Sequence, residues 1–181
     1  MAYVYGHLKT PKNTGSGVAD FILFAPIVDF EDDGIKCPEA PFSAKGDEVT
    51  VKVPHVFKTG KGFVRILLAP EKNQLNGKTF GDLGFQKFGF EYDIFIPGSY
   101  AEVHEFAKNI LNTPLIALGK DSECSADMWY QLGCDCVYAY MSLDFSTGTT
   151  KDGVKGYSGK ITYNSSSMLL YKVTGGPVEI A

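Results

Sequence analysis

Apolar and polar residues alternate along much of this chain, and such alternation predicts β-strands with one buried face and one exposed face. Three segments alternate over most of their length: 48–53, 84–96 and 134–145. In the second segment, apolar side chains at every second position predict a buried face: Phe88, Phe90, Tyr92, Ile94 and Ile96. Glu91 and Asp93 then belong to the opposite, exposed face of the same strand.

Shorter apolar segments predict further strands at 18–25, 63–69, 115–118, 157–163 and 168–173. The segment 63–69 is nearly continuous in apolar residues. A continuous run of this kind is typical of a strand that is covered on both sides. We therefore expect it to be buried on both faces, apart from Arg65.

One amphipathic helix is predicted at about 99–112. Ser99, followed three residues later by Glu102, is the sequence of a capping box, in which the two side chains pair with backbone N–H groups of the first turn. Apolar side chains then recur at helical spacing: Val103, Phe106, Ala107, Ile110 and Leu111. We expect this stripe to pack on a sheet. A shorter helical turn is predicted at 125–132, ended by Gly133.

Two long segments show neither periodicity and are predicted to be loops, at 26–47 and 70–84. Residues 1–17 are predicted to be an N-terminal arm. A chain of 181 residues fits one domain, so residues 1–181 are assigned to a single unit. The predicted elements make that unit mainly β with one helix, in the α+β class.

The composition is that of an ordinary folded globular protein. Hydrophobic residues are 44% and charged residues 21%, which excludes a disordered chain. No apolar run approaches the roughly 18 residues of a membrane helix, and no basic stretch followed by an apolar one marks a secretory signal. We therefore expect no membrane partner.

Charge is unevenly distributed along the chain. The net charge is −4 and Arg65 is the only arginine, whereas nucleic-acid readers carry clustered basic residues with several arginines. Segment 20–48 has eight acidic residues and two lysines, and segment 52–72 has five basic residues and one acid. These are either two solvated loops or complementary surfaces for head-to-tail self-association. For the second interpretation, the candidate contact residues are Asp29, Glu31, Asp32, Asp33, Lys52, Lys58, Lys61 and Lys72.

The sequence contains no recognisable catalytic, metal-binding or cofactor-binding motif, so we expect none of these sites. The three histidines have no partner at metal-ligand spacing: His7, His55 and His104. Cys134 and Cys136 are too close together for a zinc knuckle, and without an export signal the four cysteines are expected to be reduced. Asp29–Asp33 looks like the start of a calcium loop, but Ala40 stands where a bidentate glutamate is needed. An acidic surface turn is the favoured interpretation.

The last third of the chain carries a family resemblance through the order of its elements. Leu132-Gly133 precedes the long strand 134–145, a turn rich in threonine and glycine spans 146–156, and two short strands end near Lys172. This order resembles the tail tube (major tail) proteins of tailed bacteriophages, and related tube subunits of type VI secretion and other contractile injection systems. The resemblance extends to the layout of residues 18–175.

The resemblance implies an antiparallel β-sandwich or partly closed barrel flanked by the single helix. It implies a structural virion protein that assembles into stacked, hexameric rings around a hollow tail tube, made in the host cytoplasm and not an enzyme. Glu91 and Asp93 would face the lumen, which DNA would traverse without sequence-specific binding. The implied partners are further copies of the chain and other tail proteins: sheath, terminator and baseplate.

Two other interpretations stay open. One is a monomeric β-sandwich that binds a carbohydrate or another ligand, with calcium near Asp29–Asp33; oligomeric state and a calcium-dependent melting shift would identify it. The other is an enzyme whose site is assembled around His55 or Cys124. Unusually fast reaction of one of those two side chains would identify the enzyme.

Overall fold

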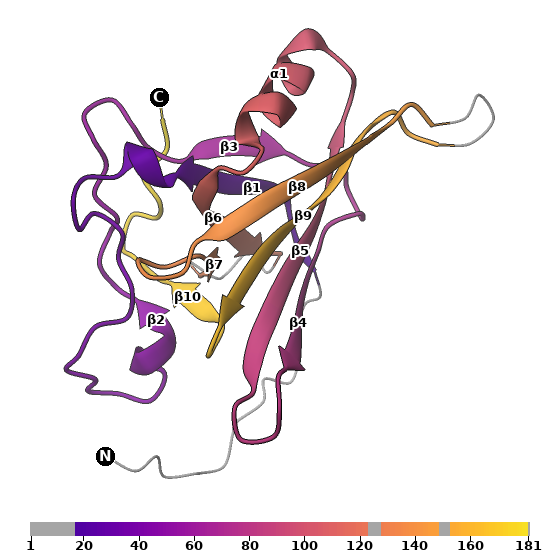
Figure 1. Cartoon of the computed structure of the whole chain (residues 1–181). Coiled ribbons are helices and arrows are strands. Elements are labelled where there is room, and N and C mark those ends of the chain that lie inside the picture. The colour runs from indigo at the N-terminus through magenta and orange to yellow at the C-terminus, as the bar shows by residue number, and fades with distance from the viewer. Residues whose placement is uncertain (1–16, 123–127, 149–152, 181) are drawn as a thin grey trace.

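The computed structural model describes residues 17–122, 128–148 and 153–180 (Figure 1). The N-terminal arm up to residue 16, Cys124 and the centre of the turn at 149–152 lie outside the described residues. The strands are β1 Val18–Pro26, β2 Thr50–Val51, β3 Val64–Leu67, β4 Gln74–Phe80, β5 Lys87–Pro97, β6 Pro114–Asp121, β7 Trp129–Leu132, β8 Ala139–Ser146, β9 Gly156–Ser165 and β10 Leu169–Tyr171. The helices are α1 Ala101–Ile110 and two 3₁₀ turns, η1 Ile27–Asp29 and η2 Asp47–Val49.

The described part of the chain is mainly β with a single α-helix, as the sequence predicts. Its ten strands form one mixed sheet that does not close into a barrel, in the order β2-β10-β7-β6-β8-β9-β5-β4, with β1 added to β6 and β3 added to β1. Among the described strands, the pair of β10 and β2 is parallel and the other pairs are antiparallel.

The sheet divides into two parts at β6. On one edge of β6, Ala117 pairs with Leu132 of β7, and Leu115 pairs with Ala139 of β8. Residues 133–138 leave this line as a turn, after which the chain continues into β8. We call β3-β1-β6-β7-β10 the buried half-sheet and β8-β9-β5-β4 the polar half-sheet.

The main core fills the space between the inner faces of the two half-sheets. It combines Ile22 and Phe24 of β1 with Tyr92 and Ile94 of β5 and further apolar residues of β6, β8 and β9. The inner faces are tightly packed at Gly119 of β6, where an added Cβ would collide with the ring of Tyr92. The helix closes one end of this core (Figure 1), because the Phe106 ring lies 5.6 Å from that of Phe24.

The outer face of the buried half-sheet is covered by residues 27–63, which we call the cover. Phe30, Val51 and Phe63 of the cover pack against Leu23 and Ile116 of the half-sheet in a second core cluster. Both faces of β1 and β6 are therefore removed from water. Burial on both faces explains why the sequence of β1 is continuously apolar.

Several predicted elements are confirmed and others are wrong. The alternating strand 84–96 becomes β5, with its inner face buried as predicted, although Phe88 at its start is partly exposed. The prediction of a loop at 70–84 is wrong, because β4 lies within it. β4 forms the outer edge of the sheet and carries mostly polar side chains, so its sequence lacks a buried face. The helical turn predicted at 125–132 is also wrong, since β7 occupies Trp129–Leu132.

The segments flanking these strands need further correction. The predicted strand 48–53 contains only the two residues of β2, after η2. The 3₁₀ turn forms there because the Asp47 carboxylate accepts the backbone N–H groups of Ser43 and Ala44. The predicted strand 134–145 begins only at Ala139. The segment 63–69 is not buried on both faces, because Val64 and Leu67 of β3 are exposed, Leu67 to 70%.

The helix forms where it is predicted, but its start differs. The N-cap residue is Tyr100 and no side chain caps the helix, so the predicted capping box is absent. The Ser99 hydroxyl instead lies 2.9 Å from Nε2 of His104, whose Nδ1 lies 2.6 Å from the Tyr157 hydroxyl. A side-chain network to β9 therefore replaces the cap.

Candidate functional site

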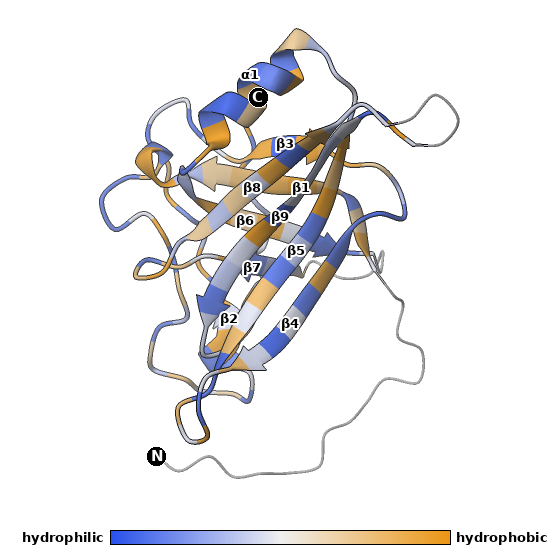
Figure 2. Cartoon of the chain, turned by 45° about the vertical axis from the view of Figure 1, so that its right-hand side comes forward, coloured by the Kyte–Doolittle hydropathy of each residue, from blue (hydrophilic) through white to orange (hydrophobic). Residues whose placement is uncertain are grey.

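The outer face of the polar half-sheet carries a continuous set of polar side chains. Alternation along β4, β5, β9 and β8 places one set of side chains outward, while their neighbours enter the main core. The outward set includes Gln74, Asn76, Lys78, Glu91, Asp93, Ser142, Asp144, Ser158, Lys160, Thr162 and Asn164. We call this surface the polar face; Figure 2 shows the blue and white residues that run along its strands.

The centre of the polar face is an ion-pair cluster. The Lys160 ammonium group lies 2.8 Å from Glu91 Oε2 and 3.7 Å from Asp93 Oδ1, and Asn76 Nδ2 donates to Asp93 Oδ2 at 3.2 Å. The hydrogen bond from Lys160 holds the pKa of the Glu91 carboxyl below its usual range, and the carboxylates raise the pKa of Lys160. Glu91 and Asp93 do share an exposed face, as alternation predicts. The Lys160 ammonium group lies close to both carboxylates, however, so this part of the polar face is not simply acidic.

Two shallow hollows lie on the polar face beside this cluster. One, of about 300 Å³, is lined by Asn76, Lys78 and Glu91 together with Thr162 and Asn164. The other, of about 340 Å³, has a similar polar lining around Asp93, Asp144, Ser158 and Lys160. Hydroxyl and paired charged groups line both hollows next to apolar rings, those of Phe80 and Phe90 in the first hollow and that of Phe95 in the second. Such a surface holds water and lacks the clustered arginines of a phosphate-binding site.

The polar half-sheet ends in two unpaired strand edges. Among the residues that the structure describes, β4 pairs with β5 alone, and β8 pairs with β6 only at Ala139 and Tyr140. Residues 141–146 of β8 therefore have no strand partner on their second edge within the described chain. Since the four strands alternate in direction, β4 and β8 run in opposite directions.

The charged residues proposed for contacts between subunits are partly paired within the chain. Lys61 lies 3.0 Å from Asp29, and Lys52 lies 2.6 Å from Asp47. Lys58 donates to the backbone oxygen of Val28 at 2.7 Å. The Lys61–Asp29 and Lys52–Asp47 ion pairs thus join the acidic and basic segments within a single chain.

The remaining members of that set lie apart from one another. Glu31, Asp32 and Asp33 are exposed in one turn of the cover. Lys72 lies at the other side of the sheet, with its ammonium group 4.5 Å from the centre of the Phe95 ring. The structure therefore brings Asp29 and Lys61 together, but it places Lys72 far from the acidic turn in the fold.

The turn at Asp29–Asp33 presents lysines rather than a cage of carboxylates. Lys61 faces Asp29, and the Lys36 ammonium group donates to the backbone oxygen of Asp33 at 2.8 Å. The described residues contain no group of three or more histidine, cysteine or acidic side chains placed to hold a metal ion. In the described part of the chain, no helix has the length and apolar character needed to cross a membrane.

His55 is the centre of a buried polar network that the sequence did not reveal. Its Nδ1 accepts the Lys36 backbone N–H at 3.0 Å, and its Nε2 lies 3.2 Å from Gln131 Oε1. Gln131 Nε2 in turn donates to the backbone oxygens of Lys36 and Gly133. Burial lowers the pKa of His55 to about 4, and the nearby Lys36 charge acts in the same direction. The network fastens the cover to β7.

A disulfide joins the cover to the turn between β7 and β8, two residues from an exposed thiol. Cys37 pairs with Cys134, whose Cα atom lies 5.8 Å away, within the range that a disulfide needs. The expectation that these two cysteines are reduced is therefore wrong. Cys136 is a free, exposed thiol. Cys37 and Cys134 are 97 residues apart, and no sequence motif predicts that they pair.

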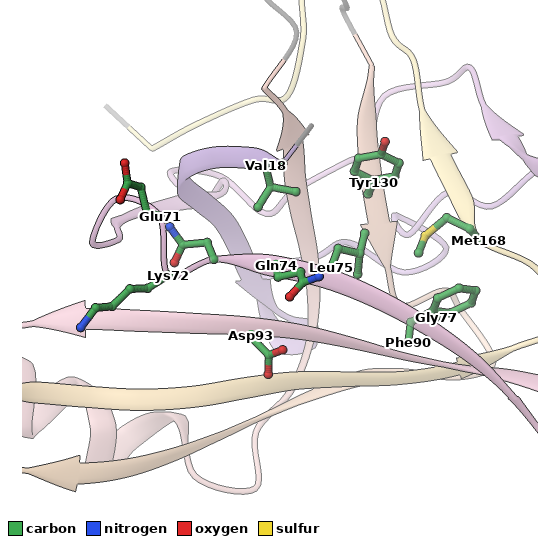
Figure 3. Close-up of a pocket in the computed structure, with 12 residues that line it drawn as sticks. Val18, Glu71, Lys72, Gln74, Leu75, Gly77, Phe90, Asp93, Tyr130 and Met168 are labelled. Carbon is green, nitrogen blue, oxygen red and sulfur yellow. The ribbon is translucent and has the colours of Figure 1, made fainter. Parts of the chain in front are cut away.

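A cleft of about 740 Å³ opens between β4 and the buried half-sheet (Figure 3). Leu75, Phe90 and Met168 give it an apolar lining, while Lys72 and Gln74 add polar groups. Asn73 also lines this cleft, and its Oδ1 atom is buried with no hydrogen-bond partner among the described residues. The cleft offers amide and carboxylate groups next to apolar surface.

Comparison with known proteins gives no relative for this chain. No family model, no curated protein and no solved structure matches it. Arguments about function therefore rest on the geometry described above.

Proposed function

We propose that this chain is a structural subunit that self-assembles into rings and tubes, as the tail tube subunit of a bacteriophage. The single observation that carries the proposal is the pair of free, oppositely directed edges of the polar half-sheet. Exposed strand edges are sites at which further strands add. A subunit with two different complementary edges forms heterologous contacts, and these close into rings when the rotation between copies allows.

The strand directions suit such a ring. When copies are related by rotation about an axis along the strands, β4 of one copy meets β8 of the next. Four alternating strands make that junction antiparallel, like the pairs within the half-sheet. β4 has seven residues and the free part of β8 has six, so each junction can form a ladder of roughly 20 Å.

The polar face supports a role in lining a passage. The inner face of each polar half-sheet is buried in the main core of its own subunit. A continuous barrel of polar half-sheets joined between subunits would therefore expose the polar face to water. Glu91 and Asp93 are offset by Lys160, and hydroxyl and amide groups surround them. A hydrated wall of this kind holds DNA weakly, since phosphate binding needs available clustered cations.

The first experiment is negative-stain electron microscopy of the purified protein over a concentration series, with light scattering on the same samples. The proposal predicts rings or tubes with a central channel. A particle that stays at the monomer mass of 19.7 kDa at every concentration contradicts it.

A cysteine-pair experiment tests the proposed junction itself. In a background with Cys124→Ser and Cys136→Ser, Asn76→Cys on β4 is combined with a cysteine at each position of 141–146 in turn. Oxidation is expected to give intermolecular ladders for the register-matched pairs. Variants carrying the β4 cysteine alone, or a β8 cysteine alone, are the controls and are expected to give none. Cross-linking between two β4 cysteines would instead indicate a two-fold contact and contradict the ring.

The cleft of about 740 Å³ favours a second candidate, a monomeric module that binds a carbohydrate. Its apolar lining beside the polar groups of Lys72 and Gln74 is a feature of a small-molecule site. A panel of oligosaccharides would raise the melting temperature of the wild type but not of Gln74→Ala. No shift with any sugar, together with assembly in the microscope, excludes this candidate.

A further inference from the structure

The tip of the β4–β5 hairpin carries apolar side chains that this copy of the chain leaves in water. Leu83 is 90% exposed and Phe85 is 84% exposed, and Phe80 and Phe88 flank them at the ends of the two strands. The tip is an ordered turn, since the Phe85 N–H donates to the Asp82 backbone oxygen at 2.9 Å. Burying a leucine or phenylalanine side chain yields about 1.5–3 kcal/mol, so exposed pairs of this kind mark contact surfaces.

An apolar groove lies at the opposite end of the molecule, between α1 and β3. It has a volume of about 400 Å³, and Phe24, Ile66, Ile96, Val103 and Phe106 form its apolar lining. Leu67 stands at its rim, largely exposed. A cavity of about 150 Å³ accepts benzene, so this groove has room for a phenyl ring and a leucine side chain together.

β5 connects these two features directly. Its first residue, Lys87, follows the hairpin tip, and Ile96 near its other end lines the groove. The ten residues from Lys87 to Ile96 span roughly 31 Å of antiparallel strand. Figure 1 shows the β4–β5 hairpin at the bottom of the molecule and α1 with β3 at the top.

We propose that the hairpin tip of one copy inserts Leu83 and Phe85 into the α1–β3 groove of a second copy. The contact is heterologous, and its two halves lie at opposite ends of the strand axis. Such a contact does not close on itself, so it adds copies along a line. This inference rests on the proposed function and supplies its axial contact, the one between successive rings, in addition to the lateral contact of β4 with β8.

Charge complementarity favours a second copy as the occupant. The tip carries Lys87 and Asp82, and the groove rim carries Glu102, and none of these three side chains forms an ion pair within the described residues. Insertion of the tip would bring Lys87 of one copy to Glu102 of the next. Arg65, also at the rim, is already held by Glu179 through two hydrogen bonds of 2.9 and 2.6 Å.

The test uses two assembly-deficient variants of the full chain and one control. The tip variant is Leu83→Asp with Phe85→Asp, and the groove variant is Leu67→Asp with Val103→Asp. Val28→Asp is the control, because Val28 is 70% exposed on the cover, away from both features. By sedimentation and electron microscopy, each deficient variant is expected to weaken axial association at least a hundredfold, since central apolar anchors dominate such contacts. Val28→Asp is expected to stack as the wild type does.

Mixing the two deficient variants distinguishes this contact from any other. The tip variant keeps an intact groove and the groove variant keeps an intact tip, so a mixture can form one productive contact and then stop. The expected result is that two units join through one axial contact in the mixture. Neither variant alone is expected to form such a joined pair. Lys87→Glu is expected to weaken stacking, and Glu102→Lys in the same chain to restore it.

The outcomes separate this inference from the proposed function. Rings that no longer stack in the tip variant support both. Linear stacks without rings support the axial contact and contradict the lateral one. Rings or tubes that stack equally well in the tip variant overturn the axial contact and leave the ring intact. A Glu102→Lys, Lys87→Glu chain that stacks no better than Lys87→Glu alone overturns the assigned charge pair.

Discussion

The two half-sheets share one inner core but differ in what covers their outer faces. On the buried half-sheet, the cover removes the outer side chains of β1 and β6 from water. On the polar half-sheet, the outer side chains of β5 and β9 stay exposed and form an ion-paired, hydroxyl-rich surface. The first half-sheet is committed to stability. The second keeps one face and two edges available, and it supplies the proposed lateral contact and the hairpin tip of the axial contact, whose groove lies between α1 and β3.

The strongest test of this difference is to truncate one side chain in each half-sheet and compare the losses of unfolding free energy. Leu118→Ala on β6 removes a fully buried side chain, and the resulting cavity is expected to lower the free energy of unfolding by about 4 kcal/mol. Thr162→Ala on the polar face is the matched control and is expected to change it by about 0.5 kcal/mol or less. Urea unfolding measures both. Similar losses at the two sites would show that the outer faces do not differ as described.

The attachment of the cover gives the next largest expected effect. Replacing Cys37 and Cys134 by serine removes a link that closes a separation of 97 residues, and this is expected to cost about 3 kcal/mol of unfolding free energy. A reducing agent should lower the stability of the wild type to that of the double variant. Cys136→Ser is the control and is expected to melt like the wild type. Equal stability of oxidised and reduced wild type would contradict the disulfide.

Acidification tests the buried His55 network within the same cover. The folded pKa of about 4 lies below the unfolded value of 6.5, so the unfolded state binds more protons between these values. The contribution of His55 to stability is therefore complete above about pH 6.5 and is lost as the pH falls toward 4. Between pH 7 and pH 4.5 this amounts to about 2 kcal/mol.

The measurement is urea unfolding over that pH range for the wild type and for His55→Gln. The variant is expected to be less stable at pH 7 but to lose less stability on acidification. Thr162→Ala, which changes an exposed side chain that does not titrate, serves as the control and should retain the wild-type slope. An unchanged slope in His55→Gln would remove His55 as the source of the pH dependence.

The smallest expected effect concerns the ion-pair cluster of the polar face. Lys160→Gln should leave the unfolding midpoint nearly unchanged, because exposed ion pairs contribute little to stability. The pKa of the Glu91 carboxyl should rise toward its usual value, since Lys160 lowers it. Titration by NMR measures this shift, and Lys155→Gln, away from the cluster, should leave it unchanged. A Glu91 pKa that is the same in Lys160→Gln as in the wild type would contradict the cluster.

The sequence predicted those parts of the fold in which periodicity reflects burial. β5 has one face in the core and one in water, so its alternation identified both the strand and the exposure of Glu91 and Asp93. The stripe of α1 was predicted for the same reason. β4 was not predicted, because it is an edge strand whose mostly polar residues form no alternating apolar series. It forms a strand because it pairs with β5.

The long-range features of the cover and the candidate site were beyond sequence reasoning. His55 and Gln131 are 76 residues apart, and their hydrogen bond depends on how the cover lies on β7. The Cys37–Cys134 disulfide depends on the same placement. The acidic and basic segments were recognised from the sequence, but only the fold shows that Asp29 and Lys61 pair within one chain.

Four alternating strands in the polar half-sheet also constrain how such a chain can diverge over generations. Gain or loss of a single strand would turn the two outer edges parallel to each other and destroy their fit. Gain or loss of a whole hairpin would preserve it, because two strands restore the alternation. Descendants of this chain can therefore widen or narrow the half-sheet in hairpin units, by duplication or deletion within the gene, while their edges remain matched.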